Sequence, residues 1–98
     1  MDENNLSVFG ELFGDSVRVK ILEFFLEADK VAFPIDAVVE DKEIGKSQAY
    51  ELVEELVKKK YLTRDKIHRR KQYYKLNARN SVIKDLKVLF RKLLLSSF

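Results

Sequence analysis

The sequence predicts a mainly α-helical α+β domain that occupies the whole of residues 1–98. Apolar residues recur at helical spacing through most of the chain, which is typical of amphipathic helices. Two β-prone runs, 61–67 and 72–76, are separated by a short polar tip and predict a hairpin in a sheet of two or three strands. The length suits one hydrophobic core, and no linker, repeat or low-complexity tract divides the chain.

Residues 1–14 are expected to form an N-terminal arm. Its apolar side chains recur at helical spacing, and these are Leu6, Phe9, Leu12 and Phe13. A small domain with one core has little reason to keep this much apolar surface at a terminus. We therefore expect the arm to pack on the core or on a second subunit.

The next segment predicts a helix that ends near residue 29 and is capped by Asp15 or Ser16. A brief extended piece follows at residues 31–33. The inward stripe of the helix is Val17, Ile21, Leu22, Phe25 and Ala28.

Residues 34–60 predict a helix-turn-helix. Pro34 fits the first turn of a short helix, about 34–42, because its missing N–H costs nothing there. A tight turn follows, and Ser47 is a good N-cap for the second helix, about 48–60. Two favourable i,i+4 ion pairs are expected on the outside of that helix, namely Glu54 with Lys58 and Glu55 with Lys59.

In such a motif the second helix enters the major groove of DNA by its N-terminal end. Glutamine can pair bidentately with adenine, glutamate can accept from cytosine N4, and tyrosine can reach a phosphate or a thymine methyl. The inward face of helix 48–60 is Ala49, Leu52, Val53 and Leu56. Its early outward side chains are Ser47, Gln48, Tyr50, Glu51 and Glu54.

The hairpin, over residues 61–77, carries a basic tip. Four cationic or titratable side chains meet there: His68, Arg69, Arg70 and Lys71. They repel one another and stabilise nothing inside the fold, so the tip makes physical sense against a polyanion, most commonly a nucleic-acid backbone. Tyr73 and Tyr74 point to opposite faces of the second strand, and at least one is expected to pack on the core.

Residues 80–96 predict a final helix that Asn80 or Ser81 caps. Its two apolar stripes together are wider than one core-facing surface needs, which indicates a dimerisation helix. The stripes are Val82, Leu86, Leu89 and Leu93, and beside them Ile83, Phe90 and Leu94.

The net charge of +3 hides a strong asymmetry. Residues 1–57 carry five Lys/Arg and fourteen Asp/Glu, a net −9, whereas residues 58–98 carry fourteen Lys/Arg and two Asp/Glu, a net +12. A solvated basic surface is the ordinary explanation of a charge run. Concentration on a hairpin and its neighbours favours an anionic partner instead.

Composition argues against several other classes. The chain has no cysteine, no apolar run longer than three residues and an acidic, polar start, so we expect a cytoplasmic protein with no secretory signal and no membrane span. Gly45-Lys46-Ser47 resembles the end of a phosphate-binding loop, but Glu40 stands where its first glycine belongs. His68 is the only histidine, and the cations beside it disfavour the imidazolium of an acid–base catalyst. We therefore expect no enzyme, no cofactor and no metal site.

Four segments resemble winged helix-turn-helix transcriptional regulators, and above all the small ArsR-like regulators of archaea and bacteria. The resemblance covers residues 12–95. The segments are 12–22 (LFGDSVRVKIL), 46–50 (KSQAY), 56–62 (LVKKKYL) and 72–77 (QYYKLN).

The resemblance implies a homodimer that binds double-stranded DNA in a sequence-specific way. The helix after the turn would be the recognition helix in the major groove, and the hairpin would be a wing along the backbone or minor groove. On the recognition helix the expected DNA-binding residues are Lys46, Ser47, Gln48, Tyr50, Glu51 and Glu54. On the wing they are Arg64, Lys66, His68, Arg69, Arg70, Lys71 and Lys75. The expected dimer surface is Leu6, Phe9, Leu12 and Phe13 of the arm with Leu86, Leu89, Phe90, Leu93 and Leu94 of the last helix.

Two other functions stay open from the residues alone. The broad apolar last helix and the glutamates of the second helix also suit a winged-helix module that binds another protein. The exposed tyrosine of the hairpin also suits stacking on RNA or single-stranded DNA.

Overall fold

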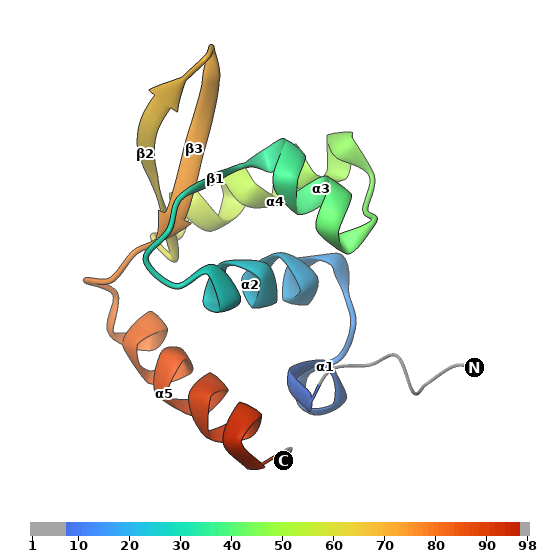
Figure 1. Cartoon of the computed structure of the whole chain (residues 1–98), viewed down its shortest axis with the longest axis vertical. Helices are drawn as coiled ribbons and strands as arrows, with labels where there is room; N and C mark the ends of the chain where they lie inside the picture. Colours follow the sequence, from blue (N-terminus) through green and yellow to red (C-terminus); the bar gives the residue numbers. More distant parts are fainter. Residues whose placement is uncertain (1–7, 97–98) are drawn as a thin grey trace.

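The computed structural model describes residues 8–96, which form helices α1 to α5 and a three-stranded antiparallel sheet of order β1-β3-β2 (Figure 1). The expected mainly helical α+β class is confirmed. The hairpin projects from one end of the helical body, and α5 lies at the opposite end beside α1. Leu6 of the expected arm lies outside the described residues.

Helices α1 (Val8–Phe13) and α2 (Val17–Ala28) open the fold. Ser16 is the N-cap of α2, because its Oγ accepts a hydrogen bond from the N–H of Val19 at 3.2 Å. The inward stripe extends beyond the prediction. Phe24 is buried although it was not expected to be, since its ring packs edge-on against Phe33 at 5.2 Å between centroids.

Strand β1 (Phe33–Pro34) follows α2 and pairs antiparallel with β3, opposite Tyr74 and Tyr73. The expected extended piece at 31–33 therefore begins two residues early. Pro34 precedes α3 (Ile35–Lys42) as its N-cap and does not form its first turn. Because proline has no N–H to donate, it suits this place at the edge of the sheet.

Helix α4 (Lys46–Lys58) begins two residues before the predicted start. Its N-cap is Gly45, whose carbonyl accepts from the N–H of Ala49 at 2.9 Å, so the prediction that Ser47 caps this helix is wrong. Glycine is itself a favourable N-cap, which explains why the serine is not needed there. The helix ends when Lys60 adopts a left-handed φ of 68° and the N–H of Tyr61 donates to Leu56 O at 2.9 Å.

Strands β2 (Leu62–His68) and β3 (Lys71–Leu76) form the predicted hairpin, which we call the wing. A bulge interrupts the pairing between Arg64 and Ile67. The Gln72 side chain closes the bulge, because its Nε2 donates to the carbonyl oxygens of Asp65 and Lys66 at 3.3 and 3.2 Å. The bulge bends the strand and so redirects the outer half of the wing.

Helix α5 (Ser81–Ser96) ends the described chain. Asn80 caps it, because its Oδ1 accepts from the N–H groups of Val82 at 2.8 Å and Ile83 at 3.2 Å. Only Ile83 and Phe90 of this helix are buried. The core lies among α2, α3, α4 and the base of the wing, and its largest fully buried side chains are Ile21, Phe25, Val38, Val53, Leu56, Leu62 and Ile83.

Candidate nucleic-acid interface

The first turn and a half of α4 is an open surface. Ala49 and Val53 point into the core, and this anchoring leaves the intervening side chains on the outside. Tyr50 keeps 46% of its surface exposed, which is unusual for a large aromatic side chain of a small domain. The outward predictions are confirmed at this end of the helix, where Lys46, Ser47, Gln48, Tyr50 and Glu51 are exposed.

Unlike the exposed residues at the start of α4, Glu54 contacts the wing through its carboxylate. Its Oε2 accepts a hydrogen bond from the Tyr74 hydroxyl at 2.6 Å, and its Oε1 forms an ion pair with Arg64. Tyr74 is buried, and this burial beside a carboxylate raises its pKa from 10.0 to about 12. The expected Glu54–Lys58 pair is replaced by these contacts, and the negative charge of Glu54 is compensated inside the protein.

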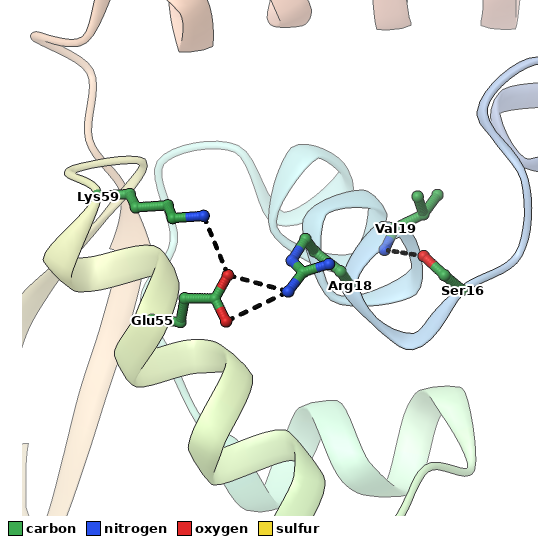
Figure 2. A network of polar contacts seen from close by, with 5 residues as sticks. All are labelled: Ser16, Arg18, Val19, Glu55 and Lys59. Carbon is green, nitrogen blue, oxygen red and sulfur yellow. Dashed lines mark hydrogen bonds and ion pairs between the residues drawn. The ribbon is translucent and has the colours of Figure 1, made fainter.

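Glu55 is compensated in the same way (Figure 2). Arg18 of α2 donates to both of its carboxylate oxygens, at 3.2 and 2.9 Å, and Lys59 lies at 3.2 Å as the predicted i,i+4 partner. The hydrogen bond from Lys59 and the guanidinium of Arg18 lower the pKa of Glu55. Of the three glutamates in this part of α4, Glu51 alone has no cation beside it among the described residues.

Most of the wing cations along its length are also paired. Lys75 lies 3.3 Å from Asp65, and Lys71 lies 2.7 Å from Asp36 at the start of α3. Lys66 sits over the ring of Tyr73, with 5.2 Å from Nζ to the centroid. The expected division of the tyrosine pair is confirmed, since Tyr74 is buried and Tyr73 is half-exposed.

The wing tip carries two exposed arginines. Arg69 and Arg70 have no carboxylate partner within residues 8–96, and both side chains are exposed. His68 contacts the Tyr73 ring edge-on at 6.1 Å. Among the described wing residues, these two adjacent arginines at the far end and Lys66 are the lysines and arginines without a carboxylate partner.

The backbone at the tip is strained. Arg69 and Arg70 have φ values of +52° and +68°, so the two-residue turn is left-handed at both positions. Such turns normally use glycine, which has no β-carbon to clash, or asparagine, whose short polar side chain can hydrogen-bond locally. Backbone strain of this kind gathers at functional sites. The two arginines therefore make the turn less stable than asparagine and glycine would.

Asp36 is a site residue that the sequence analysis missed. Its Oδ1 lies 3.6 Å from the Nζ of Lys46, and its Oδ2 lies 2.7 Å from the Nζ of Lys71. Nothing in the local sequence pattern indicated that Asp36 would contact both α4 and the wing.

The described residues of the expected dimer surface fall into a buried group, a half-buried group and an exposed group. Phe9 packs against Phe90 with 5.6 Å between centroids, and both are buried within one chain, so neither is exposed to a partner. Leu12, Phe13 and Leu94 remain exposed at 58%, 42% and 44%. Leu86, Leu89 and Leu93 are half-buried along α5.

No group of three or more potential metal ligands forms within residues 8–96. In the same part of the chain, no helix is long and apolar enough to cross a membrane.

Several solved structures of other proteins are similar to this fold. No protein-family model and no curated protein matches the sequence. Among solved structures, the homodimeric winged helix-turn-helix DNA-binding domain of a possible ArsR-family transcriptional regulator from Mycobacterium bovis is similar, with a TM-score of 0.61 and 14% identity over 89% of this chain and 75% of that one.

Two further solved structures share the arrangement. The ferric uptake regulator of Francisella tularensis, solved with iron, has a TM-score of 0.61 and 19% identity over 82% of this chain. BpsR of Bordetella bronchiseptica, whose DNA binding is regulated by 6-hydroxynicotinic acid, has a TM-score of 0.57 and 20% identity over 85% of this chain. This chain spans 60% and 59% of their lengths, respectively. The protein has the winged helix-turn-helix fold, and the solved structures that share it include transcriptional regulators.

Proposed function

We propose that this protein is a transcriptional regulator that binds specific sequences of double-stranded DNA as a homodimer, in the cytoplasm of a bacterium or archaeon. The observation that carries the proposal is the wing tip. Two adjacent arginines stand there in a strained turn, exposed and without a carboxylate partner among the described residues. Arginine at such a tip suits contact with DNA phosphates.

In this proposal α4 is the recognition helix, which contacts the base edges of the DNA. Its N-terminal end is exposed and carries side chains with the donor and acceptor groups that distinguish base edges. Gln48 suits adenine, Glu51 suits cytosine N4, and Tyr50 suits a phosphate or a thymine methyl. Because Glu54 and Glu55 are already compensated by Arg64, Arg18 and Lys59, their repulsion of a phosphate backbone is much reduced.

In the proposed homodimer, α5 and α1 form the interface. A 16-residue helix that buries only Ile83 and Phe90 leaves apolar surface for a partner. Leu94 is exposed on α5 itself, and exposed Leu12 and Phe13 extend the apolar surface onto α1. A two-fold dimer of this kind reads a pseudo-palindrome whose half-sites are about one helical turn apart. The similar Mycobacterium bovis domain is homodimeric.

Selection of duplexes from a randomised library tests the proposal. We expect enrichment of a pseudo-palindromic site and tighter binding to that site than to single-stranded DNA or RNA of the same sequence. Enrichment of no sequence together with equal binding to all duplexes would leave a non-specific DNA-binding protein. Absence of nucleic-acid binding at low salt would refute the proposal and favour a protein-binding module.

A further inference from the structure

Asp36 lies between two cations that belong to different DNA-binding elements. Its Oδ2 is 2.7 Å from the Nζ of Lys71, the first residue of β3 after the wing tip. Its Oδ1 is 3.6 Å from the Nζ of Lys46, the first residue of α4. One carboxylate of α3 therefore bridges the wing to the start of the recognition helix.

This bridge is within reach of the surface that reads DNA. Asp36 and Lys71 line a small cavity of about 30 Å³ together with Tyr50 of the recognition helix and Gln72 of the wing. The hydrogen bond from Lys71 and the nearby charge of Lys46 lower the pKa of Asp36, so the carboxylate is ionised at neutral pH. A phosphate that approached either ammonium group would meet this negative charge as well.

The bridge is also exposed enough to be exchanged. The Lys46 side chain is 65% exposed, that of Lys71 is 55% exposed and that of Asp36 is 36% exposed. Ion pairs of this kind contribute little to folding stability and weaken in salt. Asp36 is therefore positioned to compete with DNA phosphates for the two lysines without being needed for the core.

We infer that Asp36 is a specificity-determining residue, which restrains sequence-independent DNA binding by occupying Lys46 and Lys71. The inference rests on the proposed function. Non-specific binding depends almost wholly on phosphate contacts, so a carboxylate that withholds two cations reduces it directly. Specific binding depends also on base contacts at Gln48 and its neighbours, which Asp36 does not touch. The bridge widens the ratio between specific and non-specific affinity when the register at the selected site does not place phosphates against Lys46 and Lys71.

The test compares Asp36→Asn with Glu40→Gln, which removes the same charge from an exposed position of α3 that has no cation beside it among the described residues. Affinity for a random-sequence duplex is measured over a salt series, beside affinity for the selected site. Asp36→Asn should bind the random duplex several-fold more tightly, with a log–log salt slope steeper by up to about 0.9, because the variant frees one unit of positive charge for the phosphates. The ratio of specific to non-specific affinity should fall. Glu40→Gln should change the slope by less than half as much.

Variants of Lys46 and Lys71 give a second test, which does not require the Asp36→Asn protein to fold stably. Because Asp36 offsets one of their two charges, Lys46→Ala with Lys71→Ala should flatten the random-duplex slope less than Arg69→Ala with Arg70→Ala. In that lysine-free background, Asp36→Asn should have no effect on the slope.

Three results would overturn the inference: an Asp36→Asn slope equal to that of Glu40→Gln, an effect of Asp36→Asn that persists without the lysines, or a loss of slope in the double-lysine variant as large as that in the double-arginine variant. Failure of the wild-type protein to bind any duplex would instead refute the proposed function, so the two outcomes are separable.

Discussion

Tyr74 donates its hydroxyl hydrogen to Glu54 Oε2 at 2.6 Å and thereby joins the middle strand of the sheet to α4. Arg64 of the neighbouring strand pairs with the other oxygen of the same carboxylate. The wing and α4 are thus tied at one point near the base of the wing and, through Asp36, at a second point near its tip.

The first prediction concerns the pH dependence of folding. Burial beside Glu54 raises the pKa of Tyr74 from 10.0 to about 12. Between pH 10 and 12 the unfolded chain loses this proton while the folded chain keeps it, so the free energy of unfolding must fall as the pH rises through that range. Urea unfolding at several alkaline pH values should show this fall.

The matched variant is Tyr74→Phe, which has no hydroxyl to ionise. At neutral pH it should be less stable by about 1 kcal/mol because one hydrogen bond is lost. Its stability should decline less steeply above pH 10. Parallel declines in the two proteins would show that Tyr74 does not carry the effect.

The second prediction concerns the strained turn. Replacing Arg69 with asparagine and Arg70 with glycine gives the turn residues that its left-handed backbone favours. The double variant should be more stable, by on the order of 1 kcal/mol, because the backbone strain is relieved. Its DNA affinity should fall nonetheless, because the free charges of the wing tip are gone.

Two controls separate strain from charge. Arg69→Lys with Arg70→Lys keeps the charge and the strain, so both stability and DNA binding should stay near the wild-type values. Lys60→Gly relieves a left-handed φ of 68° away from the tip and should stabilise the fold without weakening DNA binding. A less stable asparagine–glycine variant would contradict the account of the turn.

The third prediction concerns sequence reading. Gln48 is exposed at the N-terminal end of α4, and the proposed adenine contact uses both its amide groups. Gln48→Ala should lose roughly 1–3 kcal/mol of discrimination at one base pair of the selected site. Its binding to random duplexes should be nearly unchanged. Competition assays with single-base variants of the site measure this, and undiminished discrimination would remove Gln48 from the base contacts.

The fourth prediction concerns assembly. Leu89 is half-buried on α5, whereas Val88, its neighbour, is 50% exposed and lies about a quarter of a turn away on the helix. If α5 pairs with a second copy through the stripe that includes Leu89, Leu89→Glu should give a monomer in light scattering at micromolar concentration. Val88→Glu serves as the control and should remain dimeric. A wild-type monomer under the same conditions would exclude the dimer.

Much of this arrangement follows from local sequence patterns. The hairpin and its tip were predicted because β-prone runs and charges are read over a few residues, and the helix-turn-helix was predicted because its apolar spacing is periodic. The cap of α4 was not, since Gly45 and Ser47 both satisfy the preference for an N-cap and only the structure distinguishes them.

The contacts that define the site depend on tertiary structure. Asp36 reaches Lys71 across 35 positions of sequence, and Tyr74 reaches Glu54 across 20. Charge counting treated Glu54 as an outward residue with Lys58 as its partner, because i,i+4 spacing is the only ion-pair rule available before the elements are packed. The sequence could not predict that Phe33 pairs with Tyr74 in the sheet, because this contact also depends on how the elements pack.

The central claim is that the wing tip supplies phosphate contacts on double-stranded DNA. The most direct test is the salt dependence of duplex binding by the wild-type protein and by Arg69→Ala with Arg70→Ala. Each lost phosphate contact changes the log–log slope by about 0.9, so the double variant should bind more weakly with a slope flatter by up to about 1.8. An identical slope in the two proteins would contradict the claim.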